Sequence, residues 1–88
     1  MEVKTIAQRV RELMAHLFGV DVSAVTDDVK PVAKLGADSL ELIDLIMLLE
    51  DEFDVIITDE EVPDGPALTV GEWIQMVEKK VEAKNAPR

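Results

Sequence analysis

The sequence has no cysteine, and only nine of its 88 residues are lysine or arginine. Without cysteine the chain has no disulfide, no thiolate metal site and no thiol nucleophile of its own, so any thiol chemistry needs an imported group. Nineteen aspartate and glutamate residues leave a formal net charge of -10. This charge repels nucleic-acid phosphates and anionic lipid headgroups, and it favours a protein partner with a basic surface.

Long hydrophobic runs are also missing. The longest unbroken run of large aliphatic residues, Leu45–Leu49, is too short to span a bilayer, and the N-terminus has no apolar signal-peptide stretch. We therefore expect a cytoplasmic monomer without membrane insertion. Residues 1–84 are predicted to form a single domain, followed by a frayed tail at residues 85–88. In a chain this short a deep catalytic cavity would compete with the core for apolar side chains, so we expect function at the surface.

The spacing of apolar residues predicts three longer helices. Apolar side chains recur at helical spacing over residues 3–18 until Gly19, and again over residues 39–53, where no glycine or proline interrupts them. The last helix is predicted to start at a capping box, residues 69–72, and to end near Lys84, a cation that suits the negative end of a helix dipole.

The segments between these helices predict one shorter helix and one long loop. A capping box at residues 58–61 should open a short third helix, which the prolines of Pro63–Pro66 stop. Residues 20–38 are predicted to form a long ordered loop, with a short helical turn near residues 23–25. Because no strand pattern is present, the sequence predicts an all-α fold: a small four-helix bundle with a long loop between helices 1 and 2. We expect Trp73 to anchor the core.

Acidic residues are concentrated in the middle of the chain, since residues 35–78 contain 13 acids and no base. On a helical wheel of the predicted second helix, one apolar face must contact the other helices; it consists of Leu42, Ile46, Leu49 and Phe53. Leu40, Met47 and Leu48 lie instead in or beside the acidic sector. Apolar side chains framed by carboxylates indicate a docking surface for a basic partner. A solvated face, with Met47 as filler at the edge of the core, is the alternative.

Ser39 stands at the start of the predicted second helix, directly after Asp38. At that position the helix amides and dipole favour an anion, so a phosphodiester on the serine hydroxyl would be well placed; a plain helix cap is the alternative. The single histidine, His16, lies in the first helix and no nucleophile-elbow pattern surrounds Ser39, so we expect no serine–histidine catalysis. Residues 59–65 are acidic and end in Asp-Gly, but Pro63 replaces an oxygen ligand of a calcium loop and no glutamate closes it, so we expect no metal site.

Four segments form a recognisable series: residues 35–41 (LGADSLE), 45–47 (LIM), 49–54 (LEDEFD) and 58–61 (TDEE). Together they resemble a bacterial acyl carrier protein of the fatty-acid-synthesis type. The resemblance covers nearly the whole chain and is weakest between residues 62 and 67 and in the last few residues. It implies a four-helix carrier that is not an enzyme.

The resemblance also implies a prosthetic group and its site. Ser39 is expected to receive 4'-phosphopantetheine from coenzyme A through a phosphopantetheinyl transferase, with Asp38 and Leu40 beside the attachment point. Acyl groups would then travel as thioesters on the arm to enzymes of fatty acid or related lipid biosynthesis. The family binds basic patches on acyl-processing enzymes through positions that are here Leu40, Glu41, Ile43, Asp44, Met47, Leu48 and Asp51. It shelters the acyl chain in its bundle, for which the candidates here are Leu45, Ile46, Leu49, Ile57 and Ile74.

Several positions depart from the family pattern. Lys34 places a positive charge just before the serine motif, and Leu42 and Leu48 are expected to add apolar surface beside the serine and along its helix. The Pro63–Pro66 segment is an insertion that shortens or redirects the third helix. These departures leave a specialised polyketide or peptidyl carrier as an alternative. The alternative from another class is an acidic helical interaction module without a prosthetic group.

Overall fold

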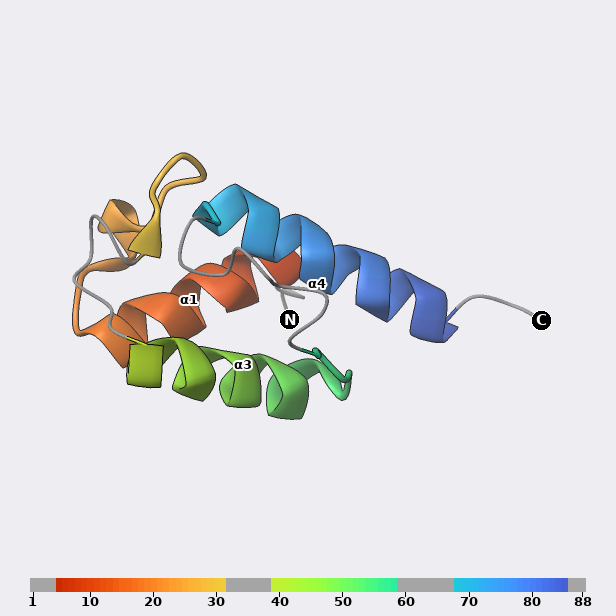
Figure 1. The fold of residues 1–88 in the computed structure, drawn as a ribbon. Coiled ribbons are helices and arrows are strands. Elements are labelled where there is room, and N and C mark those ends of the chain that lie inside the picture. Colours follow the sequence, from red (N-terminus) through yellow and green to blue (C-terminus); the bar gives the residue numbers. More distant parts are fainter. Residues whose placement is uncertain (1–4, 32–38, 59–67, 86–88) are drawn as a thin grey trace, which may run out of the picture.

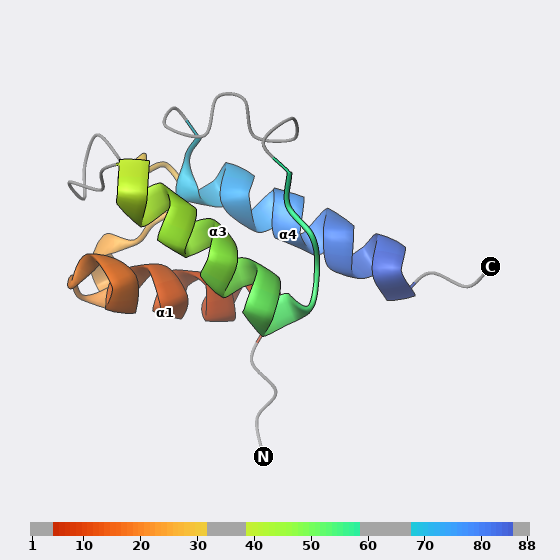
Figure 2. The same ribbon diagram turned by 60° about the horizontal axis from the view of Figure 1, so that its bottom comes forward.

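The structure is a computed structural model that describes residues 5–31, 39–58 and 68–85. These residues form three α-helices, α1 (Ile6–Phe18), α3 (Ser39–Phe53) and α4 (Val70–Asn85), and a short 3-10 helix, η1 (Val22–Ala24). Helices α3 and α4 begin at the same end of the bundle, whereas α1 runs in the opposite direction (Figures 1 and 2). The part of the chain that the structure describes contains no strand, in agreement with the all-α prediction.

The fourth helix of the prediction is not tested by this structure. It falls in residues 59–67, which lie outside the described residues. Other predicted features outside the described residues are Lys34, Asp38 and the Pro63–Pro66 insertion. The helical turn predicted near residues 23–25 is present one residue earlier, as η1. Asp21 caps it by accepting a hydrogen bond of 2.9 Å from the Ser23 N–H, which lowers the pKa of Asp21 below its ordinary value.

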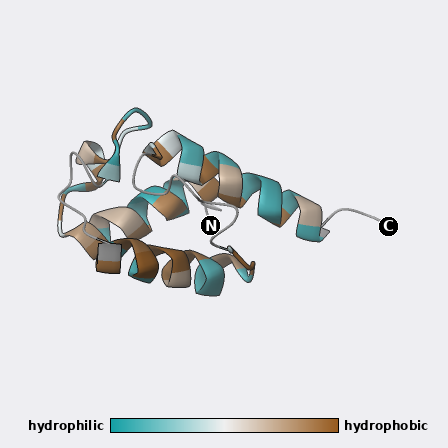
Figure 3. Cartoon of the chain, viewed as in Figure 1, coloured by the Kyte–Doolittle hydropathy of each residue, from teal (hydrophilic) through white to brown (hydrophobic). Residues whose placement is uncertain are grey.

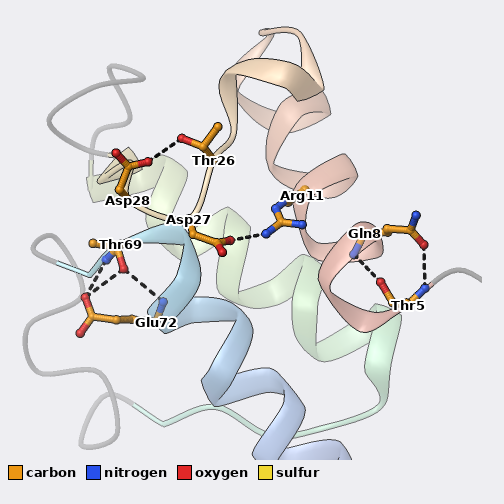
Figure 4. A network of polar contacts seen from close by, with 8 residues as sticks. All are labelled: Thr5, Gln8, Arg11, Thr26, Asp27, Asp28, Thr69 and Glu72. Carbon is orange, nitrogen blue, oxygen red and sulfur yellow. Dashed lines mark hydrogen bonds and ion pairs between the residues drawn. The ribbon is translucent and has the colours of Figure 1, made fainter.

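Helix α1 begins later than the hydrophobic spacing predicted. The expected start was residue 3, but the helix begins at Ile6 because Thr5 is its N-cap. Thr5 Oγ1 accepts from the Gln8 N–H at 3.1 Å and Gln8 Oε1 accepts from the Thr5 N–H at 2.9 Å, which completes a capping box (Figure 4). Gly19 ends the helix as predicted, and its φ of 67° lies in the left-handed region that glycine adopts without strain.

The predicted capping box at the start of α4 is present (Figure 4). Thr69 Oγ1 accepts from the Glu72 N–H at 3.2 Å, and Glu72 Oε1 accepts from the Thr69 N–H at 2.9 Å. These two bonds satisfy backbone donors that have no partner inside the helix. The local sequence therefore sets where α4 begins.

The loop after α1 supplies a second cap for α4. The carbonyl oxygens of Asp27 and Val29 accept from the N–H groups of Gly71 and Val70, at 2.9 and 2.7 Å. A Cβ at position 71 would lie 3.2 Å from the Asp27 oxygen, so glycine permits this close approach. Arg11 of α1 pairs with the Asp27 carboxylate (Figure 4). The loop is therefore fixed to both α1 and α4.

One hydrophobic core joins the three helices and the described part of this loop. Its largest fully buried side chains are Trp73, Met14, Leu45, Leu49, Val10, Val25, Val70, Val77 and Pro31. The complete burial of Trp73 confirms its predicted role as a core anchor. Val25 and Pro31 come from the segment after α1, and their burial ties its described part to the core.

Candidate functional site

Helix α3 carries apolar side chains on two faces, and it is the most continuously hydrophobic of the three helices (Figure 3). Its buried face consists of Leu42, Leu45, Leu49 and Phe53. On another face Leu40, Ile43 and Met47 are 70, 53 and 58% exposed. Residues spaced by three and four lie on one side of a helix, so these three form a continuous exposed stripe. An apolar stripe that the bundle leaves uncovered is suited to contact with a partner.

Leu42 does not enlarge this exposed stripe, and the prediction that it adds apolar surface was wrong. It is only 8% exposed, because it lies on the face that packs against the core. Leu48, which was expected to do the same, is half-buried. Ile46 is half-buried as well, and Leu45 takes the fully buried position in its place.

Carboxylates accompany the exposed stripe. Asp44 and Asp51 are exposed and Glu41 is half-buried. Asp44 and Asp51 are seven residues apart, which places them on the same side of α3, and the helix has no basic residue. We call the set of Leu40, Ile43, Asp44, Met47 and Asp51 the α3 docking surface. A surface that combines negative charge with exposed apolar side chains is suited to a partner with a basic, partly apolar surface.

Three further acids near the end of α3 are used within the fold. The Glu50 carboxylate accepts from a backbone N–H beyond the helix at 2.9 Å. Glu52 pairs with Arg9 of α1, and Asp54 pairs with Lys84 of α4 at 3.0 Å. Glu52 has the same charge as Asp44 and Asp51 on the same helix, but its ion pair with α1 gives it a role inside the protein. The acids of α3 and the residue after it therefore include structural carboxylates as well as the exposed ones of the α3 docking surface.

Cationic side chains from both neighbouring helices hold the C-terminal end of α3. The Arg9 guanidinium lies 4.8 Å from the centroid of the Phe53 ring and donates to the Glu52 carbonyl at 3.3 Å. Lys84 donates to the Phe53 carbonyl at 3.2 Å. Positive charge at this end also complements the helix dipole. The α3 docking surface is thus presented on a helix that is anchored at its far end.

The other end of α3 begins at Ser39. The first N–H groups of a helix have no partner within it, and the helix dipole makes this end partly positive, so it suits an anionic group. The next residue, Leu40, is 70% exposed, which leaves the surface beside the helix start open. Asp38, the predicted cap, lies outside the described residues. The start of α3 is therefore suited to an anionic group, and it lies next to the α3 docking surface.

The residues predicted to line an acyl pocket all belong to the core or its edge. Leu45, Leu49, Ile57 and Ile74 are buried, and Ile46 is half-buried. They come from α3, from the segment after it and from α4, and the core brings them together. A cavity among them stays a prediction.

The sequence did not predict a surface hollow near the C-terminal end of α3. It has a volume of about 380 Å³ and is lined by Asp54, Val55, Ile56, Lys80, Ala83 and Lys84. Ile56 is 75% exposed. None of the predicted site residues lines this hollow, and it lies at the opposite end of α3 from Ser39.

Other kinds of site find no support in the part of the chain that the structure describes. There, no three histidine, aspartate or glutamate side chains come together to hold a metal ion. No helix in that part combines the length and the apolar character needed to cross a bilayer. His16 is exposed in the last turn of α1.

Comparison with known proteins gives results that agree with one another. The family model described as "Phosphopantetheine attachment site" matches residues 8–77. An acyl carrier protein of Solidesulfovibrio magneticus is 42% identical over 76 residues, which cover 86% of this chain and 95% of that protein. An acyl carrier protein of Thermotoga maritima is 40% identical over 76 residues, which cover 86% of this chain and 91% of that protein.

Proposed function

Because the chain belongs to the family of proteins with a phosphopantetheine attachment site, we propose that Ser39 is the residue to which the group is attached. Family membership makes the chain a carrier rather than an enzyme, with covalent 4'-phosphopantetheine as its prosthetic group. The predictions of carrier and prosthetic group are confirmed, and the alternative of an interaction module without such a group is excluded. When bound, the arm supplies the thiol that this cysteine-free chain lacks and holds acyl groups as thioesters.

Ser39 takes part in attachment through its hydroxyl oxygen. The oxygen attacks the phosphorus that bears the pantetheine arm in coenzyme A, a serine O–P bond forms, and the bond from that phosphorus to the adenosine bisphosphate breaks. The hydroxyl proton passes to a base of the transferase. The positive end of α3 then stabilises the phosphodiester that Ser39 holds. The observation that carries the proposal is the position of Ser39 as the first residue of α3.

We assign the α3 docking surface to recognition of the transferase and of acyl-processing enzymes with basic patches. We propose that Glu41 and Leu48, which are both half-buried beside the exposed stripe, contact the same partners. Since every partner has to reach the arm, a surface that starts at the attachment residue is suited to all of them. Electrostatic attraction brings the partner to this surface, and the exposed stripe provides the close contact.

For the cargo, we propose acyl groups of fatty acid or related lipid biosynthesis, carried in the cytoplasm by a monomer. The support is that both relatives are named acyl carrier protein. A specialised polyketide or peptidyl carrier is the alternative. Loading with a panel of acyl and aminoacyl ligases separates the two, because a lipid carrier should accept fatty acids and reject amino acids.

Incubation with coenzyme A and a phosphopantetheinyl transferase tests the attachment directly. We expect the intact mass of the chain to increase by one arm and by no more. Proteolysis followed by mass spectrometry should find the arm on the peptide that contains Ser39. A chain that stays unmodified with several transferases contradicts the proposal, and so does an arm found on another peptide.

The double variant Asp44→Lys/Asp51→Lys tests the docking surface. Both side chains are exposed, so the fold should stay intact while the attraction to a basic partner is lost. At low ionic strength we expect modification by the transferase to fall about tenfold in kcat/KM, and this rate should depend less on salt. The measurement is the initial rate of arm transfer at several salt concentrations.

The matched control makes the same change in net charge on another helix. Glu78 and Glu82 are exposed on α4, outside the α3 docking surface, so Glu78→Lys/Glu82→Lys should leave kcat/KM close to the wild-type value. Equal losses in the two double variants would mean that only the net charge matters. No loss in either would place the docking contact elsewhere.

A further inference from the structure

The buried side chain of Trp73 has an unsatisfied polar atom. Trp73 is 0% exposed, and its indole Nε1 has no hydrogen-bond partner. Among the described residues it is the only buried side-chain nitrogen or oxygen in this condition. An indole N–H can only donate, so it needs an acceptor atom from elsewhere.

Among the residues that the structure describes, the core around Trp73 provides no acceptor side chain. The described core cluster consists of aliphatic, methionine and aromatic residues, and no polar or charged side chain of the described residues is buried. A buried donor without a partner costs free energy, and native proteins keep few of them. A donor left unpaired in an apolar surrounding is therefore a candidate for pairing with a bound ligand that brings its own acceptor.

Trp73 lies in the half of the core nearest the attachment residue. It is the fourth residue of α4, and Ser39 is the first residue of α3. The two helices begin at the same end of the bundle (Figures 1 and 2). The same core cluster includes Leu42 and Leu45 from the first two turns of α3. Val70 and Trp73 are therefore the buried residues of α4 closest to the end of the bundle where α3 begins. An acyl chain sheltered in this end of the core would lie beside them.

We propose that the Trp73 indole N–H donates a hydrogen bond to an oxygen atom carried by the acyl chain. This inference rests on the proposed function and names a class of cargo: acyl chains with a keto or hydroxyl oxygen in the chain. A saturated chain leaves the donor unpaired, whereas an oxygenated chain satisfies it. Trp73 is thus a binding residue that favours oxygenated over saturated cargo.

The chain offers a direct spectroscopic test, because it has one tryptophan and so gives one indole N–H signal. The ¹⁵N-labelled protein is prepared in apo form, with the bare arm, and with octanoyl, 3-oxooctanoyl or 5-oxooctanoyl groups on the arm. Intact mass verifies each loading, so a failure of the proposed function is detected separately. We expect the indole proton to shift downfield with at least one ketone chain and to stay near its apo position with octanoyl.

Three results would overturn the proposal. The indole signal could stay unchanged with both ketones, or it could shift equally with octanoyl. It could also shift fully with the bare arm, which would mean that an oxygen of the arm itself occupies the donor. All three outcomes are read on the wild-type protein, so they do not depend on whether a variant folds.

The variant Trp73→Phe adds a functional measurement. Hydroxylamine attacks the thioester carbonyl, forms the hydroxamate and frees the thiol, so its rate reports how well the cargo is sheltered. Loss of one hydrogen bond should make release of 5-oxooctanoyl about fivefold faster than in the wild type, beyond any change seen for octanoyl. Val77→Ala, which removes fully buried apolar volume from the same helix, should change both cargoes equally. If the ratio of the 5-oxooctanoyl rate to the octanoyl rate is the same in the two variants, the proposal is contradicted.

Discussion

Replacing Ser39 with alanine is expected to abolish attachment of the arm completely while leaving the fold intact. The substitution removes the oxygen that forms the bond to phosphorus, and the cysteine-free chain contains no thiol that could replace the prosthetic group. Alanine is a good helix former, so α3 should still start near this residue, and the free energy of unfolding should change by no more than about 0.5 kcal/mol. Intact mass after incubation with transferase and coenzyme A measures the first effect, and urea unfolding measures the second.

Ser23 provides the matched control, since it is the only other serine of the chain and is exposed in η1. The variant Ser23→Ala should gain one arm at the wild-type rate. If Ser39→Ala also gains an arm, the attachment residue lies elsewhere. If Ser39→Ala unfolds, the serine has a structural role that its place at the helix start does not explain.

The helices and the place of Ser39 at the start of α3 were predictable because their signals are local. A capping box such as Thr69 and Glu72 satisfies donors within a few residues, so it acts in the same way in any surrounding. The motif around Ser39 is similarly compact, and its position at the start of α3 follows from the uninterrupted helix-forming residues behind it. The same logic, applied to apolar spacing alone, started α1 too early because it did not consider the Thr5 cap.

Contacts between distant segments could not be predicted in this way. The carbonyls of Asp27 and Val29 cap α4 from a loop more than 40 residues earlier in the chain, and no pattern in either segment indicates the pairing. The division of the acids on α3 is another such case. Glu52 and Asp51 are neighbours with the same charge. The ion pair between Glu52 and Arg9 becomes visible only when α1 has been placed beside α3. The unpaired Trp73 donor is also visible only after the core is assembled.

Leu40→Ala and Leu45→Ala are the same substitution in one helix, but we expect them to change different properties. Leu45→Ala should lower stability, and Leu40→Ala should lower the rate of modification. Leu45 is 0% exposed, so its truncation should lower the free energy of unfolding by about 2–5 kcal/mol through lost burial and a cavity. For a domain of this size that corresponds to a fall of about 10 °C or more in Tm. Leu40 is 70% exposed and should change stability by no more than about 0.5 kcal/mol. Thermal and urea unfolding of the apo proteins measure both changes.

The rate of modification by the transferase also distinguishes the two variants. Leu40 is the apolar residue of the docking surface closest to Ser39. If it is one of the few contacts that carry most of the binding energy, its truncation costs more than about 1 kcal/mol and kcat/KM falls about fivefold or more. Leu45→Ala, measured well below its Tm, should be modified at nearly the wild-type rate because it removes no surface contact. If the two variants lose stability equally, α3 is rotated in solution relative to this structure. If both keep the wild-type modification rate, the exposed stripe does not bind the transferase.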